Sequence, residues 1–76
     1  MRFSAHKFKR AVQAWQVEGI ACGEHRTQAD VAAANDVSPT TITAWKQGTT
    51  TPPAWRWPKI AASIGCTVDD LTNGRA

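Results

Sequence analysis

The chain has 76 residues, of which 42% are hydrophobic and 20% charged, and its formal net charge is +3. This length predicts a single domain, residues 1–76, with one modest core, and the composition excludes an intrinsically disordered chain. No apolar run approaches the roughly 20 residues that span a bilayer, and basic residues surround Phe3 and Phe8, where a signal peptide would be apolar. We therefore expect a cytoplasmic protein with no membrane contact.

The first predicted element is a helix that begins after the capping residue Ser4 and stops at Gly23. Its apolar residues recur at helical spacing, which predicts one buried stripe. The members of this stripe are Phe8, Ala11, Val12, Trp15 and Ile20. Sustained alternation of apolar and polar residues is missing, so no strand is predicted.

A second, alanine-rich helix is predicted over residues 28 to about 34. Thr27 and Asp30 stand three residues apart, which resembles a capping box at its start. Asn35 and Asp36 tolerate a left-handed backbone better than most residues and break this helix.

A third helix follows this break after a tight connection. Ser38 caps it, Pro39 occupies its first position, and Gly48 stops it after about Gln47. The second and third helices together have the layout of a helix-turn-helix, in which the second of the two helices lies in the major groove of DNA.

Two more helices complete the prediction. After a loop over residues 49–54, a fourth helix runs from Trp57 to Ile64, with Gly65 as its cap. A last short helix over residues 68–72 follows the capping pattern of Thr67 and Asp70, and Asn73-Gly74 ends it. The sequence thus predicts an all-α domain of five short helices.

The cysteines and histidines do not suggest metal or redox chemistry. Cys22 and Cys66 are too few for a disulfide framework, and we expect two buried free thiols. His6 and His25 lie far from each other and from both cysteines in sequence, so we expect no metal site and no cofactor. No serine, histidine and acid set is visible in so short a chain, which argues against an enzyme.

The third helix divides into an inward and an outward face. Val37, Ile42 and Trp45 point inward by their spacing. The outward face is slim and suits a major groove, because threonine hydroxyls bond to base edges and small apolar groups contact the thymine methyl. The candidate base-contacting residues are Pro39, Thr40, Thr43 and Ala44. The alternative is an ordinary solvent-exposed face.

Polar side chains around these helices are of the kind that hold the DNA backbone. The candidate phosphate contacts are Arg26, Gln28, Thr41, Lys46, Gln47, Thr49 and Thr50. For Arg26 and Lys46 the alternative role is solubility.

The four tryptophans divide into core residues and one candidate anchor. Trp15 and Trp45 fall on apolar helix faces and are predicted to be core. Of Trp55 and Trp57, we expect one in the core, and the other is a candidate exposed anchor for a second subunit.

From Thr27 to Gly74 the sequence resembles the DNA-binding domain of lambdoid phage repressor and Cro proteins, the Cro/CI-type or XRE helix-turn-helix family. The matching segments are residues 27–32, 38–48, 57–61 and 64–74. The resemblance implies a compact five-helix lambda-repressor-like domain, with its helix-turn-helix at about residues 27–48, that binds operator DNA as a two-fold dimer. It places dimer contacts before the fourth helix and at the start of the last, which gives Trp55, Arg56, Val68 and Asp70.

This chain departs from the family pattern at three positions of the motif. Asn35-Asp36 stands where Leu-Gly is usual, and Lys46 replaces the frequent Glu after the tryptophan. The leading hypothesis is a Cro-type phage or bacterial repressor of a palindromic double-stranded DNA operator. The alternatives are an antitoxin that binds DNA and a partner protein, and an interaction module with a degenerate helix-turn-helix.

Overall fold

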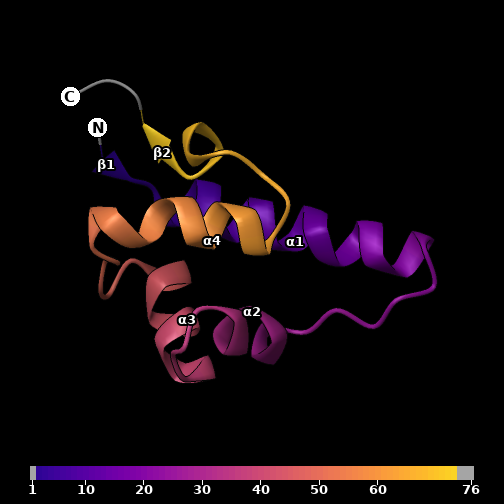
Figure 1. The fold of residues 1–76 in the computed structure, drawn as a ribbon. Helices are drawn as coiled ribbons and strands as arrows, with labels where there is room; N and C mark the ends of the chain where they lie inside the picture. The colour runs from indigo at the N-terminus through magenta and orange to yellow at the C-terminus, as the bar shows by residue number, and fades with distance from the viewer. Residues whose placement is uncertain (1, 74–76) are drawn as a thin grey trace.

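The computed structural model describes residues 2–73 and is mostly helical, as predicted (Figure 1). Four α-helices make up most of this part of the chain: α1 (Ala5–Ala21), α2 (Gln28–Ala34), α3 (Pro39–Gln47) and α4 (Trp57–Ser63). Two short 3₁₀ turns accompany them, η1 (Ala54–Arg56) and η2 (Val68–Asp70). The strands β1 (Arg2–Phe3) and β2 (Thr72–Asn73) pair antiparallel at the chain ends.

Each of the four predicted N-terminal caps is made in the structure, whereas α4 ends one residue earlier than predicted, with Ile64 rather than Gly65 as its C-cap. The hydroxyls of Ser4, Thr27, Ser38 and Thr67 accept a hydrogen bond from the backbone N–H three residues later, at 3.2–3.3 Å. Asp30 and Asp70 complete capping boxes because their carboxylates accept the backbone N–H of the threonine three residues before. These bonds satisfy N–H groups that a helix start otherwise leaves without partners.

The core is formed by buried residues from all four helices together with Ile64 and Leu71, and α3 packs against both α1 and α2. Ile42 and Trp45 of α3 are buried as predicted, and so are Phe8 and Val12 of α1. Val37, which precedes α3, is half-buried and packs against the core. The fully buried residues with large apolar side chains include Phe8, Ile42, Ile60 and Leu71, none of them exposed at all. Trp45 is 4% exposed and packs edge-on against Phe8, with ring centroids 6.2 Å apart.

The last two turns of α1 differ from the prediction. Ile20 was expected in the buried stripe but is 74% exposed, and Val17 is 65% exposed. Figure 1 shows the reason: α1 continues beyond the end of α4, so no element covers these turns on that side. Cys22, which follows α1, is exposed rather than buried, while Cys66 is half-buried.

The C-terminal segment also differs from the prediction. The expected helix over residues 68–72 is the single 3₁₀ turn η2, after which Thr72 pairs with Phe3 and Asn73 with Arg2. No strand was predicted, because a pair of two-residue strands is too short to show alternation. Lys7 fixes this segment to α1, since its Nζ donates to the carbonyl oxygens of Asp69 (2.9 Å) and Thr72 (2.6 Å). Gly74, part of the expected stop, lies outside the described residues.

Candidate functional site

The connection between α2 and α3 is short and is stabilised by hydrogen bonds of its own residues. Asn35 is fully buried, and its Nδ2 donates to the Val31 carbonyl (2.8 Å) and to the Ser63 hydroxyl (3.1 Å). Asp36 has φ of +56°, the left-handed conformation predicted at this break. The Val37 N–H then returns to the Ala32 carbonyl at 3.0 Å. These contacts fix the angle at which α3 leaves α2.

The outer face of α3 carries the predicted base-contacting residues. Pro39 and Thr40 are exposed, and Thr43 and Ala44 are half-exposed, so the structure brings all four to one accessible side of the helix. Gly48, with φ of +79°, ends α3 as predicted. The short side chains leave the helix backbone close to any molecule that docks there.

Gln28, the first residue of α2, contacts α3 at three residues along its length. Its Nε2 donates to the Pro39 carbonyl (3.0 Å) and to the Thr43 hydroxyl (2.5 Å), and its Oε1 accepts from Lys46 Nζ (3.0 Å). Thr43 in turn donates to the Pro39 carbonyl at 3.2 Å. The two helices are therefore held in register by a polar network at the rim of the candidate face.

The remaining candidate phosphate contacts on α3 and the following loop lie around the same face. The Thr41 hydroxyl is 3.1 Å from the Ser38 hydroxyl and belongs to the cap. Gln47, Thr49 and Thr50 are exposed, and within residues 2–73 their side chains make no hydrogen bond. They flank the outer face at the C-terminal end of α3.

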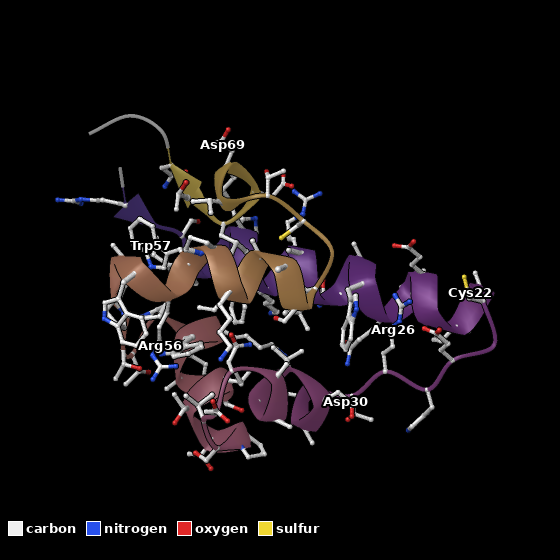
Figure 2. The ribbon with its side chains drawn as sticks, in the orientation of Figure 1. Cys22, Arg26, Asp30, Arg56, Trp57 and Asp69 are labelled. Atoms are coloured by element: carbon white, nitrogen blue, oxygen red, sulfur yellow. The ribbon has the colours of Figure 1, made fainter. Side chains whose placement is uncertain are left out.

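Arg26 is engaged in contacts within the fold. Its guanidinium donates to the Trp15 carbonyl (2.9 Å), forms an ion pair with Glu24 (2.6 Å) and lies 5.4 Å from the centroid of the Trp15 ring (Figure 2). Its side chain crosses Gly19, which is buried. Sequence reasoning missed this role, although a glycine inside a helix was a signal for close approach by another chain segment.

The four residues expected at a dimer interface belong to two separate segments. Trp55 and Arg56 belong to η1, beside the start of α4, whereas Val68 and Asp70 belong to η2. Figure 2 shows Arg56 on the α3 side of α4 and Asp69, at the centre of η2, on the opposite side. Trp55 is 71% exposed, while Trp57 packs near Phe3 and donates from Nε1 to the Pro52 carbonyl at 3.0 Å.

Most acidic side chains of residues 2–73 form hydrogen bonds or ion pairs with residues that are not on the outer face of α3. Hydrogen bonds from the backbone and hydroxyl of Thr27 lower the pKa of Asp30, and those of Thr67 lower the pKa of Asp70. Glu24 pairs with Arg26, and Asp36 with Lys59. The outer face itself carries no carboxylate, because α3 contains none.

A groove of about 410 Å³ opens on the other side of the molecule, between α1 and residues 64–70. Arg10, Trp15, Glu18, Cys66 and Asp70 are among its lining residues. Burial and the nearby Asp70 raise the pKa of the Cys66 thiol, which disfavours a reactive thiolate. The predicted base-contacting residues lie outside this groove.

Comparison of the chain with known protein families, curated proteins and solved structures finds no significant match. Within the described residues, no helix is long and apolar enough to cross a membrane.

Proposed function

We propose that the protein binds double-stranded DNA in a sequence-specific manner, with α2 and α3 as a helix-turn-helix and α3 as the helix that reads bases. The observation that carries this proposal is the outer face of α3. It is accessible, free of carboxylates and lined by short side chains, on a helix whose angle is fixed by Asn35 and Gln28. Such a face fits the major groove and offers hydroxyl and methyl groups to base edges.

In this proposal η2 takes the place of the fifth helix of a lambda-repressor-like domain. Thr40, Thr43 and Ala44 read bases, with Pro39 at the first position of the helix. Gln28, Lys46, Gln47 and the loop at Thr49 and Thr50 hold the DNA backbone. The protein acts as a repressor that binds a palindromic operator as a dimer, because one such helix makes too few base contacts for tight specific binding.

Selection of bound sequences from a random DNA pool tests this proposal. We expect an enriched palindrome with half-sites about one helical turn apart. On that site, Thr40→Val, which keeps the shape but removes the hydroxyl, should cost roughly 1–3 kcal/mol and change the preferred base at one position of each half-site. Binding to random DNA should change little.

The control is Thr50→Val, the same change outside α3. It should leave the base preference of the selected site unaltered. If no sequence is enriched, or if Thr40→Val binds both DNAs as the parent does, α3 does not read bases. The protein-interaction module would then be the better account of this domain.

A further inference from the structure

We propose that the groove between α1 and residues 64–70 binds a small zwitterion of the size of a dipeptide. Arg10 binds the carboxylate of this ligand, Glu18 binds its ammonium group, and the indole of Trp15 packs against its apolar side chain. None of the described residues that line the groove belongs to α3. The proposal therefore goes beyond DNA binding and does not depend on it.

The groove is formed where the chain turns back after α4. Gly65, with φ of +66°, lets the chain leave α4 and return past α1 to η2 (Figure 1). Ala11 and Ala14 line the groove on the α1 side and leave it open because their side chains are small, while Trp15 and Ile64 add apolar surface. The volume of about 410 Å³ falls within the range of small-molecule sites.

Two of the four charged residues that line the groove are used by the fold. Lys7 Nζ donates to two backbone carbonyl oxygens of the C-terminal segment, at 2.9 and 2.6 Å. The Asp70 carboxylate accepts from the backbone N–H and from the hydroxyl of Thr67, both at 3.0 Å. The charges that remain for a ligand are those of Arg10 and Glu18.

Arg10 and Glu18 have opposite charges but do not pair with each other. Within residues 2–73, neither side chain makes a hydrogen bond or an ion pair. They stand four residues before and four residues after Ala14 on α1, which places their Cα atoms about 12 Å apart. Helix residues four apart pair readily, whereas residues eight apart have a further turn between them. A ligand that lies over Ala14 and carries both charges bridges this gap.

The separation of the two charges selects the size of the ligand. A free amino acid has its ammonium and carboxylate groups on one carbon. An extended dipeptide places them about 7 Å apart, so it reaches toward Arg10 and Glu18 at the same time. An aromatic side chain on the dipeptide adds apolar contact with Trp15 and Ile64.

Titration of the isotope-labelled chain with alanylphenylalanine, followed by NMR, tests the proposal. At about pH 6 the ammonium group of this dipeptide is charged. We expect saturable shifts of the Trp15 indole N–H and of the backbone amides of Gly65 and Cys66, with a Kd on the order of 1 mM. The indole of Trp55, which is exposed outside the groove, should not shift. The buffer is reducing because Cys22 is exposed.

Blocked forms of the dipeptide assign each charge to its residue. Acetylation removes the ammonium charge and should weaken binding to the parent about threefold to fivefold, and Glu18→Gln should weaken binding of the free dipeptide by a similar factor. In Glu18→Gln, acetylation should then cost nothing more. Amidation of the carboxylate should relate to Arg10→Gln in the same way. Ala14→Leu, which fills the space between the two charges, should abolish binding.

Lys9→Gln and Asp69→Asn are the matched controls, because each removes a charge from an exposed residue outside the groove. Both should bind the dipeptide as the parent does. Shifts that do not saturate up to about ten times the expected Kd would overturn the proposal. Shifts confined to residues outside the groove, or an equal cost of acetylation in the parent and in Glu18→Gln, would also overturn it. No DNA is present, so the result is independent of the DNA-selection experiment.

Discussion

At the scale of single residues, Gly19 shows how one missing side chain shapes the fold. A Cβ at this position would lie 2.5 Å from Arg26 Cδ and 2.7 Å from its Cγ, so Arg26 would have to leave its place against Trp15. Glycine inside a helix otherwise costs about 1 kcal/mol relative to alanine. The close approach of Arg26 is the physical reason for a glycine here.

We therefore predict that Gly19→Ala destabilises the parent protein but stabilises a variant in which Arg26 has been replaced by alanine. In the parent, the loss of the Arg26 contacts should outweigh the gain in helix propensity, and the free energy of unfolding should fall. In an Arg26→Ala background the same substitution should raise it by about 0.5–1 kcal/mol. Urea unfolding of the four proteins of this cycle measures both effects, and additive changes would show that Arg26 does not require the glycine.

The capping carboxylates make stability depend on pH in a specific direction. The pKa of Asp70 is lower in the folded chain than that of an ordinary aspartate, because Thr67 donates to its carboxylate. Its contribution is therefore complete above the unfolded-state pKa and is lost as the pH falls through the folded-state pKa. We predict that Asp70→Asn makes stability less dependent on pH on the acid side.

Asp69→Asn is the control for this effect, because it removes the same charge from the same turn without removing a capping bond. Thermal melts between neutral pH and acid measure the dependence. Equal behaviour of the two variants would assign the acid sensitivity to net charge rather than to the cap.

At the scale of elements, most helix boundaries were predictable because they are local. Ser4, Thr27, Ser38 and Thr67 each act within three residues of their own position, so the pattern in the sequence is the interaction itself. The β1–β2 pair joins segments about 70 residues apart and has no local signal. The exposure of Ile20 also depends on where α4 ends, which the periodicity of α1 does not contain.

The left-handed residue of the α2–α3 connection leads to a third prediction. Asp36 adopts φ of +56°, which is strained for a residue with a Cβ and free of strain for glycine. Asp36→Gly should therefore raise the free energy of unfolding by about 0.5 kcal/mol, with part of the gain offset by the freer unfolded chain.

Asp36→Ala is the comparison, because it removes the same carboxylate without relieving the backbone. It should lower the free energy of unfolding by about 1 kcal/mol. Chemical denaturation of both variants measures the difference. If glycine and alanine have equal effects, the exposed ion pair with Lys59 is more important for stability than the backbone conformation.

At the scale of the whole molecule, the residues that share the outer face of α3 were predictable from the sequence. The hydrogen bonds that link this helix to α2 were not. Ile42 and Trp45 turn inward by helical period, and this leaves Thr40 and Ala44 outside. The bonds of Gln28 to Pro39, Thr43 and Lys46 depend on how α2 packs on α3. The position of η1 relative to η2 likewise depends on the path of α4: Figure 2 shows Arg56 and Asp69 on opposite sides of that helix, which the sequence alone did not indicate.

The distribution of charge over the molecule leads to the last prediction. Lys46 lies at the rim of the outer face of α3, bonded to Gln28, whereas Arg10 lines the groove on the other side together with Glu18 and Asp70. If α3 enters the major groove, Lys46 is near the DNA backbone and Arg10 is not. Each phosphate contact releases counterions, so its loss makes the dependence of binding on salt less steep.

Lys46→Ala should therefore weaken binding to the selected site and to random DNA alike, and reduce the salt slope by about one for each bound chain. Arg10→Ala, with the same change in net charge, should leave the slope nearly as in the parent. Binding measured on both DNAs across a salt series separates local contact from overall charge. If the salt slope of DNA binding falls equally in the two variants, DNA is attracted by the net charge of +3 and not by a phosphate contact of Lys46 at the rim of α3.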